Sequence, residues 1–309
     1  MCLPALAAQT YPNYEIILVD NGSTDGSVPY VREQFPQARL ICLDENAGFA
    51  RPNNIGIRAS QATYLATLNN DTKVDPNWLT ELVRAAEANP AAGMCAAKLL
   101  FYDRPDVVNS AGICLDRLGI AWDRWGGRVD AAEGAAPTAV FGPSAGAALY
   151  RRAMLDEIGL FDEDYFAYLE DVDLAWRARL AGWDCLYVDT AVVYHRHSAT
   201  AVEGSPFKNR LLGRNKVWTI LKNYPAPALF LYLPLILAYD LGSVAAALGQ
   251  RRDASPLYGR LQALAGFAKM WRKRRLIQRR RRISNREMLR LMEPVASPAN
   301  VFRRYRHLG

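Results

Sequence analysis

The sequence lacks several patterns that would point to simple function classes. No two cysteines stand close enough for a zinc or redox motif, so reduced and buried thiols are expected. The start of the chain has no basic segment followed by an apolar one, which is the pattern of a secretory leader. A glycine-rich loop carrying a lysine, common in nucleotidyl transfer on nucleotide-binding sheets, is also missing there. The five cysteines are Cys2, Cys42, Cys95, Cys114 and Cys185.

Acidic residues are scarce toward the C-terminal end of the chain. Residues 251–309 contain 17 lysines and arginines but only 3 acidic residues, whereas residues 1–250 contain 21 and 28. A mildly acidic body with a strongly basic tail favours anionic partners, either lipid headgroups or nucleic acid. No aromatic platform accompanies the arginines, so lipid is the expected partner and nucleic acid is not.

Apolar runs and helical patterns alternate through the first half of the sequence. Strands of this kind, separated by helices, predict an α/β fold with a mostly parallel central sheet covered on both faces. Ligands of such sheets bind beyond the carboxyl ends of the strands, where Asp20 and Asp71 fall. The predicted strands are Glu15 to Val19, Arg39 to Leu43 and Thr63 to Leu68, and the predicted helices lie near residues 27–34, 51–60 and 76–89, the last capped by Asp75.

The middle of the chain has a different character. Residues 120–138 show no period and are expected to form a mobile loop, in which Trp122 and Trp125 either stack on a sugar or anchor the loop. Small residues at 142–146 would allow the backbone to approach a ligand closely. A helix is predicted over 170–181, and one or two strands follow it and end at His195.

An apolar stretch at 226–249 is long enough to cross a bilayer. Asp240 near its middle would cost several kcal/mol there, roughly 2.5–3.5 on insertion scales. Two prolines also interrupt the stretch, so an interfacial or re-entrant helix is favoured over a spanning or core helix. The basic, amphipathic pattern over Lys269 to Arg282 predicts attachment to anionic lipid, with a solvated charge run as the alternative.

Short motifs occur in order along about residues 2–225. Together they resemble those of family 2 glycosyltransferases, in particular the bacterial rhamnosyltransferase-like branch. The resemblance implies a GT-A fold, a nucleotide-diphosphate sugar donor, a divalent metal and inversion at the anomeric carbon. The motifs are Ala8 to Glu15 (AQTYPNYE), Val19 to Ser27 (VDNGSTDGS), Asn46 to Arg51 (NAGFAR), Leu68 to Thr72 (LNNDT), Gly159 to Glu163 (GLFDE) and Tyr168 to Leu174 (YLEDVDL).

The resemblance assigns a metal, Mg²⁺ or Mn²⁺, to Asp71, the acidic member of the motif that the family often writes Asp-x-Asp. One carboxylate can suffice, because these ions keep waters and accept diphosphate oxygens as ligands. His195 follows the strand where the family often places a metal-binding histidine, and a purely structural histidine is the alternative. His197 would point to the opposite side of an extended segment.

Five residues match positions that would hold the nucleotide-sugar donor. In the family the counterpart of Asp20 accepts hydrogen bonds from the base or ribose, whereas here it could also act only as a cap. Asn21 also matches this set, although it looks more like a builder of the turn that follows. The set is Asp20, Asn21, Arg51, Asn69 and Asn70.

Glu170 and Asp171 match the Glu-Asp pair of the family. Asp171 is expected to act as general base toward the acceptor hydroxyl, and Glu170 to orient it or to bind the acceptor. The first turn of a helix favours the ionised carboxylate, which could equally be the whole role of Asp171. Asp173 and Arg177, four residues apart, are expected to pair on one helix face.

Two departures from the family pattern stand out. The chain begins within the family's first helix, so the first strand with its Tyr-Asn pair is missing from it, and a gap or exposed sheet edge is expected. Pro52 replaces a common glycine, which the first turn of a helix tolerates.

The sequence therefore predicts an inverting glycosyltransferase that moves a sugar, plausibly L-rhamnose, onto a lipid-linked or polysaccharide acceptor. It would work as a peripheral protein at the cytoplasmic face of the cell membrane. Residues 1–205 would form the catalytic domain and residues 206–309 a helical extension. The alternatives are a truncated glycan-binding or scaffold protein and a nucleotidyltransferase.

Overall fold

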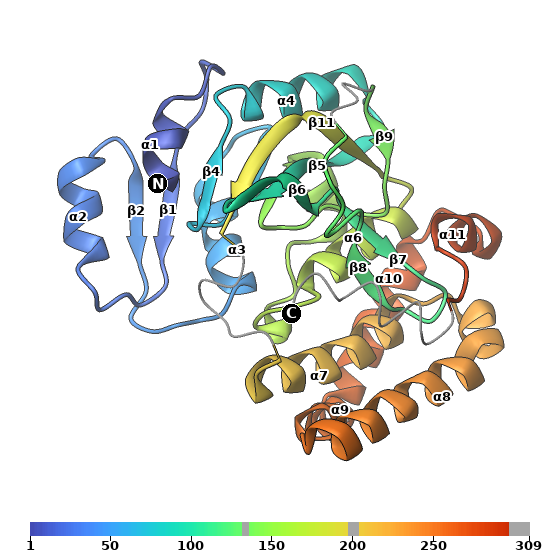
Figure 1. Ribbon diagram of the computed structural model, residues 1–309. Helices are drawn as coiled ribbons and strands as arrows, with labels where there is room; N and C mark the ends of the chain where they lie inside the picture. The colour runs from blue at the N-terminus through green and yellow to red at the C-terminus, as the bar shows by residue number, and fades with distance from the viewer. Residues whose placement is uncertain (132–135, 197–203, 297–309) are drawn as a thin grey trace.

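The computed structural model describes residues 1–131, 136–196 and 204–296 (Figure 1). An α/β body carries a layer of helices at its C-terminal side. The α/β class and the helical C-terminal region are as predicted. Its helices are α1 (Cys2–Ala7), α2 (Ser27–Gln34), α3 (Ala50–Ala59), α4 (Trp78–Ala88), α5 (Arg152–Ile158) and α6 (Glu170–Leu180), followed by α7 (Pro206–Asn223), α8 (Ala226–Arg251), α9 (Ser255–Ala265), α10 (Phe267–Arg280) and α11 (Asn285–Leu291).

The large sheet has the strand order β3-β10-β5-β11-β4, with β6 added to β5 and β9 added to β11. Within it β5 and β11 are parallel, whereas every other described pairing is antiparallel. The prediction of a mostly parallel sheet is therefore wrong for this sheet. The strands are β3 (Tyr64–Leu68), β4 (Thr72–Val74), β5 (Ala92–Phe101), β6 (Arg104–Ser110), β9 (Thr138–Ala139), β10 (Ala147–Arg151) and β11 (Asp184–His195).

A separate parallel pair, β1 (Ile17–Asp20) and β2 (Arg39–Cys42), lies beside the large sheet (Figure 1). Among the described residues β1 pairs only with β2, and β3 pairs only with β10. One edge of each strand is thus left without a partner strand. The expected gap in the sheet is present.

Helices cover both faces of the large sheet. Trp78, Leu82 and Val83 of α4 are buried against one face, as their helical spacing predicts. The helix begins two residues later than expected, because Asn77 occupies the N-cap position and Asp75 instead accepts a hydrogen bond from the Asn77 N–H at 2.9 Å. Trp176 of α6 is fully buried in the cluster on the opposite face.

The interpretation of residues 120–138 as a loop is incomplete. Residues 121–123 form β8 (Ala121–Asp123), which pairs with β7 (Ile113–Leu115) as a hairpin. Short strands of three residues carry too few side chains to show an alternating pattern in a sequence. Residues 132–135 and His197 lie outside the described residues.

The C-terminal layer begins with α7, whose first residue is Pro206. Glycines bring α7 and α9 close together: a Cβ at Gly213 would lie 2.7 Å from the Pro256 carbonyl oxygen, and one at Gly259 would meet the Arg210 carbonyl oxygen. The pair Asp173 and Arg177 forms as predicted, at 2.9 Å and almost fully buried.

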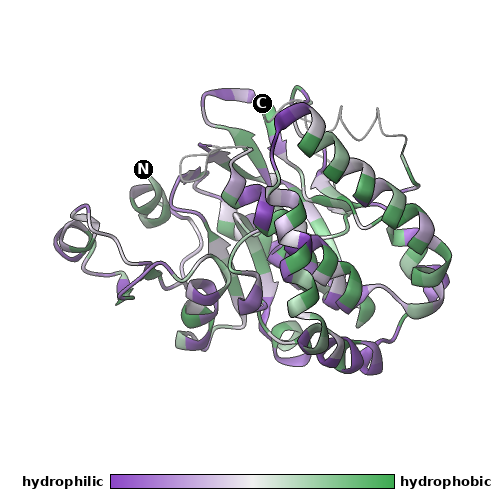
Figure 2. Ribbon diagram, turned by 90° about the horizontal axis from the view of Figure 1, so that it is seen from below, coloured by the Kyte–Doolittle hydropathy of each residue, from purple (hydrophilic) through white to green (hydrophobic). Residues whose placement is uncertain are grey.

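By length and composition, α8 is one helix among the described residues that could cross a membrane. Of its apolar 18-residue stretch, 17% is buried within the protein. Its acidic residue has partners within the protein, because Asp240 pairs with Arg260 at 2.5 and 2.6 Å and with Lys216 at 3.3 Å. Figure 2 shows the apolar residues along this helix. Those exposed on α8 are Phe230, Leu231, Leu235, Leu237, Leu241 and Leu248.

Candidate active site

The LNNDT motif (Leu68 to Thr72) and His195 meet at one edge of the large sheet. Strands β3 and β4 are at opposite ends of the strand order, so residues 69–71, which join them, pass across that edge. Thr72 in β4 pairs with His195 at the end of β11. This pairing brings the Asp71 Oδ1 atom within 3.4 Å of the His195 Nε2 atom.

Asp71 and His195 fit the requirements of a divalent cation. The Asp71 Oδ1 atom is buried and has no hydrogen-bond partner among the described residues. His195 Nδ1 lies 2.8 Å from Asn109 Oδ1, and such a partner fixes the ring orientation of a metal-binding histidine. The described residues contain no cluster of three or more His, Cys, Asp or Glu side chains suited to a metal. A cation here would therefore have two protein ligands and take the others from diphosphate and water.

A short turn connects this edge to the predicted general base. The Asn69 N–H donates to the Gly146 carbonyl at 2.9 Å, and the neighbouring Ala145 N–H donates to Asp171 Oδ2 at 3.3 Å. Thr67 fixes the turn from below, because its hydroxyl donates to the Ala145 carbonyl at 2.7 Å. Asn69 and Asp171 therefore bind adjacent residues, Gly146 and Ala145, of the same turn.

The carboxyl groups at the start of α6 are unusually basic. Burial raises the pKa of Glu170 well above its ordinary value, and the charge of Asp171 adds to the effect. One oxygen of Glu170, Oε2, is buried without a hydrogen-bond partner among the described residues. Burial also raises the pKa of Asp171, although hydrogen bonds from the Val172 and Ala145 N–H groups oppose the shift. A more basic carboxylate is a better proton acceptor.

Asp123 in β8 belongs to the same group of charges, and the sequence analysis missed it. Burial raises its pKa to about 6, a hydrogen bond with Ser110 opposes the shift, and the charge of Asp171 adds to it. His195 also acts on this carboxyl electrostatically. Asp123 lies in no recognisable motif, so only the pairing of β7 with β8 reveals its place.

The predicted donor residues divide into two groups. Asp20, at the end of β1, is 7% exposed and accepts a hydrogen bond from the Ser23 N–H at 3.1 Å. Arg51 and Asn70 are exposed at the start of α3 and in the β3–β4 turn. Arg51 and Asn70 are therefore open to a ligand, whereas Asn69 is partly exposed and Asp20 nearly buried.

Asn21 is already engaged within the protein. Its amide nitrogen donates to Asn46 Oδ1 and to the Gly48 carbonyl, both at 2.9 Å, and its oxygen accepts from the Ala47 N–H at 2.8 Å. Gly48 has a φ of +82°, and a Cβ there would meet the Phe166 carbonyl oxygen. The turn-building interpretation of Asn21 thus has direct structural support.

The aromatic and small residues of the middle segment pack within the protein. Trp125 forms an edge-to-face pair with Tyr187 at 5.5 Å between centroids, and the Arg124 guanidinium lies 3.7 Å above its ring. A Cβ at Gly142 would meet the Ala175 side chain of α6. These contacts give Trp125 an anchoring role, and Gly142 lets the 142–146 segment approach α6.

The sequence model described as Glycosyl transferase family 2 matches residues 1–159 of this chain. The chain belongs to this family. It is a glycosyltransferase, and the family identity predicted from its motifs is confirmed.

Two relatives support the rhamnosyltransferase-like branch of the family. The O-antigen biosynthesis protein RfbC of Myxococcus xanthus is 30% identical over 65% of this chain, which spans only 16% of that protein. The N-acetylglucosaminyl-diphospho-decaprenol L-rhamnosyltransferase of Mycobacterium tuberculosis is 29% identical over 66% of this chain and 73% of that protein.

A solved structure supports the predicted GT-A fold. The crystal structure of GalNAc-T7 with UDP, GalNAc and Mn²⁺ superposes with a TM-score of 0.53 and 14% identity. The match covers 72% of this chain and 47% of that one. At this identity the likeness shows the fold alone.

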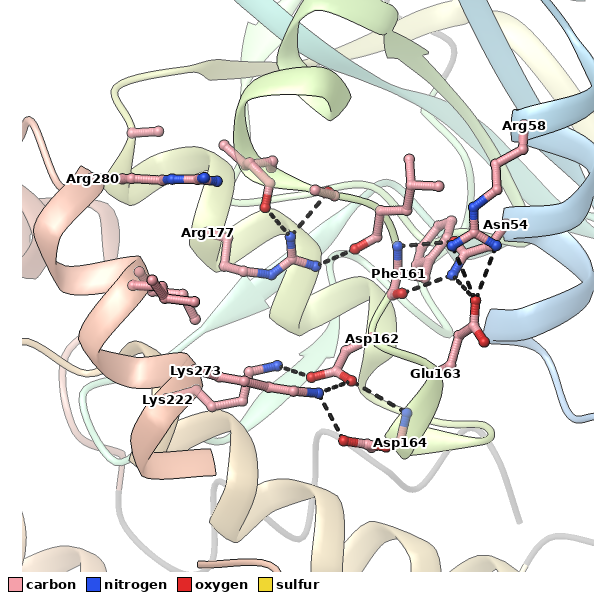
Figure 3. Close-up of a pocket in the computed structure, with 16 residues that line it drawn as sticks. Asn54, Arg58, Phe161, Asp162, Glu163, Asp164, Arg177, Lys222, Lys273 and Arg280 are labelled. Atoms are coloured by element: carbon pink, nitrogen blue, oxygen red, sulfur yellow. Dashed lines mark hydrogen bonds and ion pairs between the residues drawn. The ribbon is translucent and has the colours of Figure 1, made fainter. Parts of the chain in front are cut away.

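A cavity of about 450 Å³ lies away from the predicted residues of this glycosyltransferase (Figure 3). Its lining contains none of Asp71, Asp171 and His195. The charged groups around it are largely paired with one another, for example Lys222 with Asp162 and Arg58 with Glu163. The cavity therefore marks the contact between the C-terminal helices and the α/β body rather than the reaction centre.

Proposed function

We propose that this chain is an inverting, metal-dependent glycosyltransferase that moves L-rhamnose from a nucleotide-diphosphate donor to a lipid-linked or polysaccharide acceptor. The observation that supports the proposal most is a chain of contacts: Asp71 lies beside His195, and the adjacent Asn69 is hydrogen-bonded to the 145–146 turn that also binds Asp171. The relative from Mycobacterium tuberculosis, an L-rhamnosyltransferase by name, supports the sugar and the lipid-linked acceptor.

In this proposal the donor lies across the edge of the large sheet. Asp20 and Arg51 contact its nucleotide side, assisted by Asn21, which shapes their loop. Asn69 and Asn70 contact the ribose or sugar, and Asp71 and His195 hold the cation. A bound Mg²⁺ or Mn²⁺ would neutralise charge on the departing nucleotide diphosphate.

Asp171 takes the proton of the acceptor hydroxyl as its oxygen attacks the anomeric carbon. One C–O bond forms there, the bond to the diphosphate oxygen breaks on the opposite face, and the configuration inverts. Two backbone N–H groups hold the Asp171 oxygens, at 2.8 Å from Val172 and 3.3 Å from Ala145. Glu170, directly before it, orients this carboxylate or binds the acceptor.

The transfer would take place at the cytoplasmic face of the cell membrane, with the protein attached to its surface. The exposed apolar side of α8, continued by Leu261, Leu264 and Trp271 on α9 and α10, supports shallow insertion. The partly buried ion pair of Asp240 with Arg260 supports an interfacial α8 over a spanning one, because spanning would place these charges in the bilayer.

Fewer basic residues remain for lipid than the sequence suggests. Lys269 and Lys273 bind carboxylates of the α/β body, and Arg274 donates to the Leu221 carbonyl at 2.7 Å. Exposed Arg272, Arg275 and Arg279 would contact anionic headgroups, each contributing about 1 kcal/mol.

Transfer assays test the proposed reaction. Purified protein is incubated with dTDP-rhamnose, Mn²⁺ and a lipid-linked sugar acceptor, and anomeric configuration of the product is read by NMR. Inverted product that disappears in Asp171→Asn and Asp71→Ala is the expected result. A retained configuration, or full activity in both variants, contradicts the assignment.

Vesicle flotation tests the attachment. Binding to vesicles with anionic lipid should exceed binding to neutral vesicles, and the double variant Leu231→Ser and Leu241→Ser should weaken both. Equal recovery of wild type and variant on every vesicle contradicts surface insertion.

A further inference from the structure

The segment that leads into α6 has a strained backbone. Phe166, Tyr168 and Leu169 have φ values of 65°, 69° and 65°, in the left-handed region that residues other than glycine rarely adopt. Each such residue costs of the order of 1–3 kcal/mol, so the surrounding structure must hold it in place. Leu169 is the N-cap of α6, and Glu170 and Asp171 follow it directly.

A buried asparagine of α7 holds the carbonyl groups of this segment. Asn215 is 0% exposed, and its Nδ2 atom lies 3.1 Å from the Tyr165 oxygen, 2.8 Å from the Ala167 oxygen and 2.7 Å from the Tyr168 oxygen. Arg214 fixes the orientation of this amide, because its Nε donates to Asn215 Oδ1 at 2.9 Å. One side chain thus serves three carbonyl groups.

Neighbouring residues hold the rest of the segment. Arg214 Nη2 donates to the Asp164 and Tyr165 carbonyls at 3.1 and 2.8 Å. The Phe166 carbonyl accepts from the N–H of Phe49, the N-cap of α3, at 2.6 Å. Every carbonyl from 164 to 168 therefore accepts a hydrogen bond from outside the segment.

Side chains at the start of the segment are held by the same helices (Figure 3). Lys222 of α7 pairs with Asp162 at 2.5 Å, and Lys273 of α10 pairs with Asp164 at 2.7 Å. The buried Tyr165 hydroxyl lies 2.9 Å from the Thr219 hydroxyl of α7. Side chains of α7 and α10 thus bind this segment through ion pairs and hydrogen bonds along its length.

We propose that Asn215 is a positioning residue for the Asp171 carboxylate. It keeps the backbone of 165–168 in its strained path, which sets where α6 begins and how Asp171 meets the acceptor. The proposal rests on the proposed role of Asp171. An amide is required because it donates to several carbonyls without charge, whereas a carboxylate would repel them. Misplacement of a reacting group by about 1 Å can cost of the order of 100-fold in rate.

The test compares Asn215→Ala with Asn209→Ala. Asn209 lies on the same helix and donates to Asp253 Oδ2 at 2.7 Å, away from the segment. We expect Asn215→Ala to lower kcat by 10- to 100-fold while KM for the donor changes less than twofold. Asn209→Ala should leave both unchanged. Equal kcat in Asn215→Ala and wild type overturns the proposal.

Amide hydrogen exchange separates positioning from general destabilisation. In Asn215→Ala the amides of 165–171 should exchange at least tenfold faster, while those of β5 and β11 keep their wild-type rates. Faster exchange throughout the protein, with kcat reduced only by the unfolded fraction, indicates a merely structural role and overturns the proposal.

If Asn215→Ala does not fold, Arg214→Ala decides. It removes the hydrogen bonds to the Asp164 and Tyr165 carbonyls of this segment and the one that orients the Asn215 amide. A three- to tenfold loss of kcat at constant KM is therefore expected, and unchanged kcat overturns the proposal. Failure of the proposed function is distinguishable, because wild type would then transfer no sugar although the exchange difference at 165–171 would persist.

Discussion

Replacing Lys222 by methionine should destabilise the protein strongly. The ammonium group is 1% exposed and lies 2.5 Å from Asp162 and 2.7 Å from Asp173, which is itself fully buried. Methionine keeps much of the volume of the lysine side chain, but it removes a positive charge that pairs with both buried carboxylates. Removing one partner of a buried ion pair costs about 3–5 kcal/mol. At about 2 °C per kcal/mol for a chain of this size, Tm should fall by about 6–10 °C.

The pH dependence gives this prediction a second signature. Burial alone would raise the pKa of Asp162 and of Asp173, but Lys222 and its neighbouring cations outweigh that effect and lower both below the ordinary 3.8. Carboxyls with a lowered folded pKa contribute stability above the unfolded value and lose it as pH falls toward the folded one. The loss of stability in Lys222→Met relative to wild type should therefore be largest at pH 7 and become smaller below about pH 4.

Thermal unfolding followed by circular dichroism at pH 7, 5 and 3.5 measures both effects. Lys269→Met is the matched control, because Lys269 pairs with Asp164 of the same segment while 54% of its side chain is exposed. Exposed pairs contribute about 0–1 kcal/mol, so its Tm should change by at most 2 °C. If both variants melt within 2 °C of wild type, the reasoning about the buried network is wrong.

Four further predictions concern the base, its pH dependence, the cation and the packing of glycines. Asp171→Asn should lower kcat by about 10²–10⁴-fold, with donor affinity by calorimetry kept within threefold. In the wild type, kcat/KM should begin to fall above pH 3.8 as the pH is lowered, because burial raises the pKa of Asp171 and the base must be ionised. A kcat/KM that stays unchanged down to pH 4 would refute this. Chelation should abolish transfer and Mn²⁺ restore it, and Asn109→Ala, which frees the His195 ring, should raise the Mn²⁺ concentration for half-activity about 10- to 100-fold. Gly259→Ala should destabilise the protein since its Cβ would meet the Arg210 carbonyl, whereas Gly249→Ala, with open space around it, should stabilise α8 by up to about 1 kcal/mol in urea titrations.

Local patterns in the sequence predicted several elements of the fold. The spacing of Trp78, Leu82 and Val83 predicted α4, and the apolar run before Asp20 predicted β1, because both depend on neighbours in the sequence. The direction of β10 and the position of β4 depend on contacts between distant segments, which no local pattern encodes. The mixed sheet was therefore missed.

The candidate site divides in the same way. Asp71, His195 and Asp171 stand in motifs at element ends, so their residue types and spacing were informative. Asp123 and Asn215 reach the site only through tertiary contacts: one lies in a three-residue strand, and the other on a helix 44 positions after Asp171. A buried asparagine in a helix also resembles any other polar helical residue until its partners are known.

The β1–β2 pair has a consequence for how the nucleotide side of the site is held. It shares no described strand pairing with the large sheet, so other contacts must tie the region of Asp20 to it. Its ties to the remainder run largely through α3, at Phe49 and Ala50 with the Phe166 carbonyl and at Asn54 with Phe161. If nucleotide binding at Asp20 stabilises this region, amide exchange in α3 should slow when nucleotide is bound, before any sugar moves.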